Sequence, residues 1–168
     1  MKPTGGSDGK SADAAPQCTG KRFAIVAARF YRDLTAWLID GAQRALRDCG
    51  VASDDIDLIE VPGSYELPLA CRKLIESGRY DAIVALGVVI RGQTPHFDYV
   101  AGECARGIMD VQLDTTVPIG FGVLTTNDLA QAQERADPAR GDKGYEAAIA
   151  AATLVNIPAK LPRAGFRS

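Results

Sequence analysis

The run from Gly87 to Val100 holds the residues best suited to chemistry in this chain. It opens with apolar residues, passes through a Gly-Gln-Thr-Pro turn and reaches His96, the single histidine among 168 residues. Histidine has the side-chain pKa nearest to neutral pH and is the usual proton shuttle. A position just beyond the carboxyl end of a strand is also where open α/β sheets bind ligands. The run therefore predicts a proton-transfer site at His96.

Three other segments place polar or aromatic residues directly after an apolar run. They are Arg-Phe-Tyr at 29–31, Pro-Gly-Ser-Tyr-Glu at 62–66 and Thr-Thr-Asn-Asp at 125–128. A purely structural loop would not need these residues. If the four preceding strands are parallel, their carboxyl ends meet at one edge of the sheet, and the loops converge there.

The elements that must position these loops can be read from hydrophobic spacing. Four apolar runs predict strands, at residues 23–28, 56–61, 81–90 and 117–125. Residues at helical spacing predict helices between and after them, including one over 96–114, a short one reaching Arg135 and a last one over 142–156. This alternation predicts an α/β fold with a four-stranded parallel sheet, helices on both faces and right-handed crossovers.

Single residues refine the helix boundaries. We expect Asp33 to cap the first helix and Gly50 to end it. Trp37 would lie on the buried face of this helix. Pro68 suits the first turn of the second helix, where its missing N–H costs little. Pro118 is easiest to accept in an edge strand.

Length and composition predict one globular domain. The chain is 46% hydrophobic and 24% charged, with a net charge of −2. Residues 1–20 read as a disordered tail, 21–158 as the domain and 159–168 as a second tail. A net negative charge provides no basic surface to bind nucleic acid. The sequence also has no apolar run long enough to span a membrane and no apolar segment typical of a secretory signal peptide. We therefore expect a cytoplasmic protein without membrane or nucleic-acid partners.

Cysteine usage and absent motifs exclude several classes. Cys18, Cys49, Cys71 and Cys104 lack CxxC spacing, which favours reduced packing thiols over a metal site. No GxGxxG follows the first strand and no GxxxxGK[ST] occurs, which disfavours dinucleotide and P-loop folds. The loop after the first strand also lacks the acidic cluster that a receiver domain would need for Mg²⁺.

Five segments in register resemble the lumazine synthase family of riboflavin biosynthesis. They are Ala28-Arg29-Phe30, the run from Val61 to Pro68, the run from Gly87 to Val100, the run from Phe121 to Thr126, and Asp142-Lys143-Gly144 after Glu134-Arg135-Ala136. The resemblance spans about residues 22–157. It implies a flavodoxin-like three-layer α/β/α sandwich. It also implies a transferase that condenses 5-amino-6-(D-ribitylamino)uracil with 3,4-dihydroxy-2-butanone 4-phosphate, without cofactor or metal.

The resemblance also implies a role for individual residues. His96 would be catalytic, and the butanone phosphate would be held by Gln93, Thr94 and Arg135. The ribitylaminouracil would be bound by Phe30, Ser64, Tyr65, Glu66, Val88, Val89, Ile90, Phe121 and Lys143. Structural alternatives stay open: Phe30 as a core residue, Glu66 as a first-turn glutamate, and Arg135 and Lys143 as solvated surface residues. Two positions depart from the family pattern, because Tyr31 replaces the common asparagine and Tyr65 the more usual phenylalanine.

The assembly implied by the resemblance is a homopentamer with sites between adjacent subunits, in which Arg135 and Phe121 serve a neighbour's site. The short turn between Arg135 and Lys143 favours an icosahedral shell of twelve pentamers over a free pentamer. Association with riboflavin synthase is a further partner to consider. The alternative function is a flavin- or lumazine-binding or storage paralogue with little activity.

Overall fold

Four parallel strands form the central sheet of the computed structural model, which describes residues 14–158. The strands are β1 (Phe23–Ala28), β2 (Ile56–Val61), β3 (Ala82–Ile90) and β4 (Ile119–Thr126), in the spatial order β2-β1-β3-β4. Phe23 pairs with both Ile56 and Ala82, and Ile83 pairs with Ile119. The predicted fold class is confirmed, and the strand after Pro118 is an edge strand as expected.

Five α-helices and two short 3₁₀ turns complete the described chain. The helices are α1 (Arg32–Asp48), α2 (Leu67–Glu76), α3 (His96–Thr115), α4 (Leu129–Ala136) and α5 (Lys143–Val155). The 3₁₀ turns η1 (Ser53–Asp55) and η2 (Ser64–Glu66) precede β2 and α2. Pro68 lies in the first turn of α2, as predicted.

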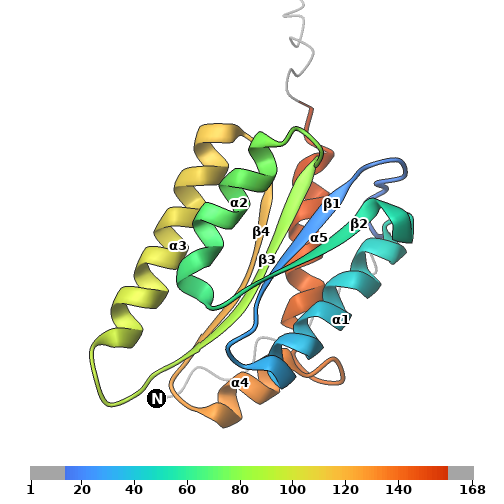
Figure 1. Cartoon of the computed structure of the whole chain (residues 1–168). Helices are drawn as coiled ribbons and strands as arrows, with labels where there is room; N and C mark the ends of the chain where they lie inside the picture. Colours follow the sequence, from blue (N-terminus) through green and yellow to red (C-terminus); the bar gives the residue numbers. More distant parts are fainter. Residues whose placement is uncertain (1–13, 159–168) are drawn as a thin grey trace, which may run out of the picture.

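The helices form one layer on each face of the sheet (Figure 1). Helices α1, α4 and α5 cover one face, and their buried residues join Phe23, Ile25 and Leu86 in one core cluster. Helices α2 and α3 cover the other face, where Cys71, Cys104 and Ile108 pack against residues such as Ile83. Strands β1 and β3 are buried on both faces, which explains why their sequences are continuous apolar runs.

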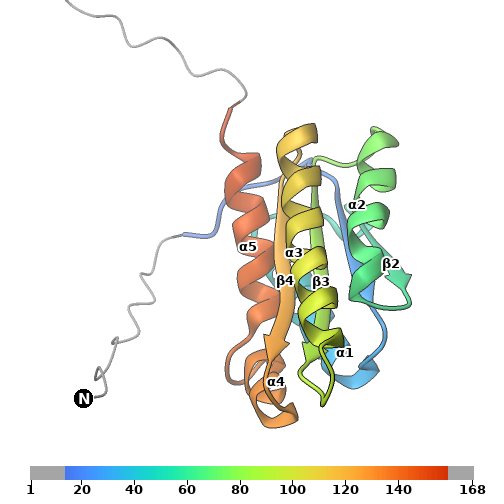
Figure 2. The same ribbon diagram turned by 90° about the vertical axis from the view of Figure 1, so that its left-hand side faces the viewer.

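The carboxyl ends of the strands meet at one end of the molecule. In Figure 2, β3 and β4 both end at the lower side, beside the start of α3 and next to α4. The loops after the strands therefore gather where the sequence predicted them.

Two expectations about α1 are wrong. The helix begins at Arg32, with Tyr31 at the cap position and no side-chain cap bond, so Asp33 lies inside the first turn. The turn is held instead by Thr35, whose hydroxyl donates to the carbonyl oxygen of Ala28 at 2.8 Å. Trp37 is 38% exposed rather than part of the buried stripe. Gly50 does follow the end of the helix, with φ of +80°.

Ordered packing extends into the expected N-terminal tail. Cys18 is 1% exposed, and its N–H donates to the carbonyl oxygen of Cys49 at 2.7 Å. The rest of that tail, residues 1–13, and the expected C-terminal tail, residues 159–168, lie outside the described residues. The boundaries of the domain at 21 and 158 stay predictions.

Within the part of the chain that the structure describes, no helix is both long and apolar enough to cross a membrane. The same residues contain no group of three or more His, Cys, Asp or Glu side chains placed to hold a metal ion. All four cysteines are buried and free, as expected from their spacing.

Candidate active site

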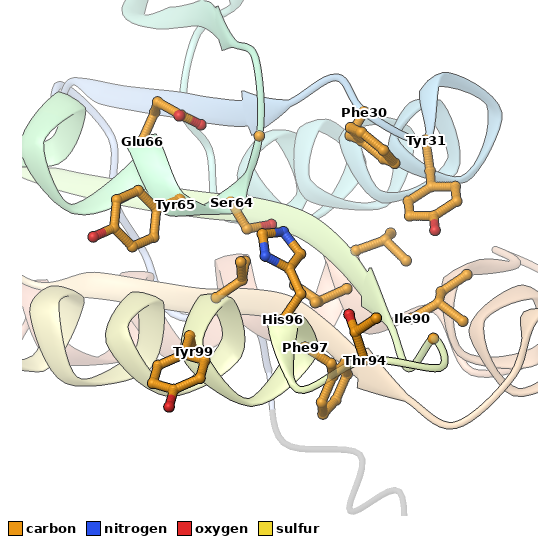
Figure 3. Close-up of a pocket in the computed structure, with 15 residues that line it drawn as sticks. Phe30, Tyr31, Ser64, Tyr65, Glu66, Ile90, Thr94, His96, Phe97 and Tyr99 are labelled. Carbon is orange, nitrogen blue, oxygen red and sulfur yellow. The ribbon is translucent and has the colours of Figure 1, made fainter.

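A cleft of about 680 Å³ opens at the carboxyl ends of β1, β2 and β3. Nine of the residues predicted from sequence line it: Phe30, Ser64, Tyr65, Glu66, Val88, Val89, Ile90, Thr94 and His96. They come from three different loops and from the end of β3 (Figure 3). The volume is in the range of small-molecule sites.

His96 is the first residue of α3 and lies on the wall of this cleft. Its side chain is exposed, and it points into the cleft from the side opposite to Phe30 (Figure 3). Thr94 lines the cleft beside it, whereas Gln93 belongs to the same loop but is not part of the lining. An exposed imidazole next to a hydroxyl and the first free N–H groups of a helix can move a proton near a bound anion.

Phe30 and Tyr31 form the aromatic side of the cleft. Phe30 lies two residues after the end of β1 at Ala28 and is 74% exposed. This exposure excludes Phe30 as a core residue. Tyr31 packs edge to face against it, with ring centroids 5.0 Å apart. An exposed aromatic face beside a cleft can stack on a planar heterocycle.

The turn after β2 supplies polar groups to the cleft. Ser64 is 5% exposed, and among the described residues its hydroxyl has no hydrogen-bond partner. A buried hydroxyl without a hydrogen-bond partner destabilises the protein, so a ligand that forms a hydrogen bond with it binds more favourably by about that free energy. Glu66 and Tyr65 are exposed at the same wall, where a carboxylate can accept hydrogen bonds from sugar-type hydroxyls.

Three more of the predicted residues, all but Gln93 of those that remain, lie in a second groove, of about 440 Å³, beside β4. Phe121, Arg135 and Lys143 line it, and no described residue lines both the groove and the cleft. Arg135 is exposed in the last turn of α4 and makes no ion pair with the described residues, so its guanidinium is available to an anion. Lys143 is less free, because its Nζ lies 2.7 Å from Oε2 of Glu146. One chain thus carries two separate groups of predicted site residues.

The turn between α4 and α5 folds back onto Arg135. The N–H of Gly141 donates to the carbonyl oxygen of Glu134 at 2.9 Å. Asp137 closes the turn by accepting from the N–H of Ala139 at 2.8 Å and from Nε of Arg140 at 3.0 Å. The hydrogen bond from Ala139 is the main cause that holds the pKa of Asp137 below its ordinary value, with Arg140 adding to it. The turn is therefore ordered by its own contacts.

Comparison with known proteins identifies the family. Residues 20–159 match the family described as 6,7-dimethyl-8-ribityllumazine synthase. The chain belongs to this family. It is also 50% identical, over 142 residues, to the 6,7-dimethyl-8-ribityllumazine synthase of Gemmatimonas aurantiaca, a match that covers 84% of this chain and 87% of that protein. The family recognised from the five sequence segments is thus confirmed.

Several residues that line the cleft of this lumazine synthase family member were not predicted from sequence. They are Tyr31, Gly63, Gly92, Phe97, Tyr99 and Val100. Helical spacing carries a signal for two of them, because Tyr99 and Val100 follow His96 by three and four residues and share its side of α3. Tyr31, Gly63 and Gly92 lie in loops that the sequence predicted to converge here, but none was given a role, and Tyr31 was noted as a departure from the family pattern.

Proposed function

We propose that this chain condenses 5-amino-6-(D-ribitylamino)uracil with 3,4-dihydroxy-2-butanone 4-phosphate to give 6,7-dimethyl-8-ribityllumazine, phosphate and water. This is the penultimate step of riboflavin biosynthesis. The observation that carries the proposal is the gathering of His96, Thr94 and an exposed Phe30 around one cleft in a member of the lumazine synthase family. The reaction needs two reactants held together, an anchored phosphate and moved protons.

The pyrimidine substrate is assigned to the cleft. Phe30 stacks on its ring, and the backbone of Val88, Val89 and Ile90 faces the uracil edge. The ribityl hydroxyls reach Ser64, Tyr65 and Glu66. The unpartnered hydroxyl of Ser64 supports this placement, because it leaves a hydrogen bond that a ligand hydroxyl can complete.

Proton transfer is assigned to His96. The primary amine of the pyrimidine attacks the ketone, one water leaves to give an imine, phosphate is eliminated, and the ring closes through the ribitylamino nitrogen with loss of a second water. Attack and loss of water move protons on nitrogen and oxygen, and elimination of phosphate also takes a proton from the carbon next to the one that carries the phosphate. All of these transfers suit an imidazole at the cleft wall. Thr94 and the backbone at Gln93 hold the phosphate near the start of α3, where free N–H groups favour an anion.

We assign Arg135, Phe121 and Lys143 to the site of a neighbouring subunit in a homopentamer. Their position in a separate groove supports this assignment, because within one chain they line no surface shared with His96. A guanidinium binds a phosphate through two parallel hydrogen bonds, so Arg135 would complete the anion site. An icosahedral shell of twelve pentamers and an association with riboflavin synthase remain part of this proposal.

Mixing two impaired variants, assayed at a low concentration of the butanone phosphate, tests the shared site. His96→Ala and Arg135→Ala chains, unfolded together and refolded in equal amounts, form some interfaces with an intact His96 from one chain and an intact Arg135 from the next. About a quarter of the sites are then whole, because each site of a heterologous ring draws on two chains. Recovery of activity to about that level supports the assignment. Activity no higher than that of the separate variants would contradict it.

The reaction itself is tested by following lumazine absorbance from the two substrates, with the uncatalysed background subtracted. A protein-dependent rate that saturates in both substrates is expected. Binding of lumazine or riboflavin without such a rate would instead point to the storage paralogue, which neither the family match nor the presence of His96, Thr94 and Arg135 favours. We also propose a cytoplasmic location, which four free, buried cysteines support.

A further inference from the structure

Arg91 opens the loop that leads from the sheet to His96. It directly follows the last residue of β3, and its N–H donates to the carbonyl oxygen of Thr126 at 2.8 Å. This hydrogen bond continues the pairing of β3 with β4 by one residue. The near end of the loop is therefore fixed to the sheet.

The side chain of Arg91 reaches to the far end of the same loop. Its guanidinium carbon lies 4.3 Å from the centre of the Phe97 ring, and Nη1 lies 3.2 Å from Oδ1 of Asp98. Phe97 and Asp98 directly follow His96 in the first turn of α3, and Figure 3 shows the Phe97 ring pointing away from the imidazole. One side chain thus connects both ends of the loop over residues 92–95.

The loop itself has little else to hold it. Residues 92–96 are all exposed, and apart from the regular hydrogen bonds within α3 their one backbone hydrogen bond to the described residues is between the N–H of Asp98 and the carbonyl oxygen of Pro95, at 3.0 Å. That bond belongs to the first turn of α3 and does not reach the sheet. Gly92 adds backbone freedom at the start of the loop.

The geometry points to Arg91 as a positioning residue that holds Thr94 and His96 in place in the cleft. This inference rests on the function proposed above. A guanidinium suits the task because it is planar and always charged, so it can stack on a ring and pair with a carboxylate at the same time. Both contacts are solvent-exposed and individually weak, so the expected effect is moderate.

The test compares Arg91→Met, Arg91→Lys and Asp98→Asn with the parent protein. Arg106→Met is the matched control, because Arg106 is an exposed arginine on α3 whose ion pairs, 2.6 Å to Glu103 and 2.7 Å to Asp110, lie away from the loop. Two quantities are measured in the full chain: hydrogen exchange of the amides of residues 91 and 98, which donate the hydrogen bonds at the two ends of the loop, and kcat with the KM for each substrate.

In Arg91→Met we expect these amides to exchange roughly 5- to 30-fold faster, which corresponds to the loss of one exposed cation–π contact and one exposed ion pair. The KM for the butanone phosphate should rise and kcat should fall, while the KM for the pyrimidine stays unchanged. Arg91→Lys should recover part of both effects because it keeps the charge. Asp98→Asn should lie between the parent and Arg91→Met, and Arg106→Met should match the parent.

Three results would overturn the inference. The first is loop exchange in Arg91→Met equal to that in Arg106→Met. The second is faster exchange with unchanged kcat and KM, because the loop would then be ordered without serving the reaction. The third is an equal rise of both KM values with a lower Tm, which indicates general loss of structure. A parent protein without turnover removes the proposed function, and the exchange rates then still decide whether Arg91 holds the loop.

Discussion

The rings of Phe30 and Tyr31 meet edge to face at the mouth of the cleft, with centroids 5.0 Å apart and planes inclined by 70°. Phe30 is 74% exposed, whereas Tyr31 is half-buried and packs against the core beneath α1. Tyr31 therefore connects an exposed ring to the packed interior. This pair leads to the first prediction.

Replacing Phe30 with Ala should weaken binding of the pyrimidine substrate. Stacking of a base on an aromatic ring contributes about 1–3 kcal/mol, so the Kd should rise roughly 5- to 150-fold. Tyr31→Leu should raise the Kd for the pyrimidine less, by about 2- to 12-fold, because it removes only the edge-to-face contact that Tyr31 makes with Phe30. Calorimetric titration with the pyrimidine measures both values. An unchanged Kd for Phe30→Ala would show that the ring does not stack on the substrate.

Replacing His96 with Ala should slow turnover and leave binding of both substrates largely intact. Loss of a general acid–base residue costs on the order of 100-fold or more in kcat. Steady-state kinetics with subtraction of the uncatalysed rate would measure it, because the substrates react slowly on their own. A kcat equal to that of the parent would remove His96 from the proposed mechanism.

Replacing Arg135 with Ala should chiefly raise the KM for the butanone phosphate. A charge-assisted hydrogen bond contributes about 1.5–3 kcal/mol, which corresponds to roughly 10- to 150-fold in KM. Arg47→Ala is a suitable comparison, since Arg47 is an exposed arginine in the last turn of α1 that lines neither the cleft nor the groove. Equal KM values for the two variants would mean that Arg135 does not anchor the phosphate.

Replacing Gly141 with Ala should displace the turn that folds back onto Arg135. An added Cβ would lie 2.7 Å from Cα of Arg135 and 2.7 Å from the carbonyl oxygen of Glu134, so the backbone must shift. We expect a loss of about 1–3 kcal/mol in stability together with a higher KM for the phosphate substrate. Gly102→Ala on α3 is the control, because an added Cβ there meets nothing within 4 Å. Unfolding curves and kinetics that do not distinguish these variants would contradict the expectation.

Alkaline pH should destabilise the fold through the buried thiols of Cys71 and Cys104. Desolvation raises the pKa of each from an ordinary value of 9.0 to about 12. The folded state keeps these protons where the unfolded chain loses them, so the stabilisation is complete below pH 9 and declines between pH 9 and 12. The slope approaches ~1.4 kcal/mol per pH unit for each thiol.

Urea unfolding at several pH values would measure this decline in the parent and in the Cys71→Ala, Cys104→Ala double variant. The variant should lose stability less steeply, because the titration of other groups is common to both proteins. Identical slopes would show that the thiols do not contribute.

Most of the fold could be predicted because its signals are local. The ranges of β1 and β2 were predicted without error, since an apolar run bounded by polar residues is complete within the sequence. The start of α1 could not be predicted in this way. Its turn is held by the hydroxyl of Thr35, which reaches back to the end of β1, and such a contact depends on the folded geometry.

The site was predicted through the family resemblance more than through spacing. Phe30 illustrates the gain from structure, because its exposure decides between a core residue and a ligand-facing one. Arg91 illustrates what the sequence could not predict, because its contacts with Phe97 and Asp98 depend on the folded path of the loop. No periodic pattern in the sequence marks that closure.

The strand order β2-β1-β3-β4 also constrains how the chain can fold during synthesis. Parallel strands cannot pair through a hairpin, so every pairing waits for a crossover segment to be made. The central pair of β1 and β3 cannot be complete until Leu86 has left the ribosome, and β3 keeps an open edge until Thr126 follows. A nascent chain that stalls between these two residues therefore exposes an apolar strand edge, the kind of surface that chaperones cover and that aggregates otherwise.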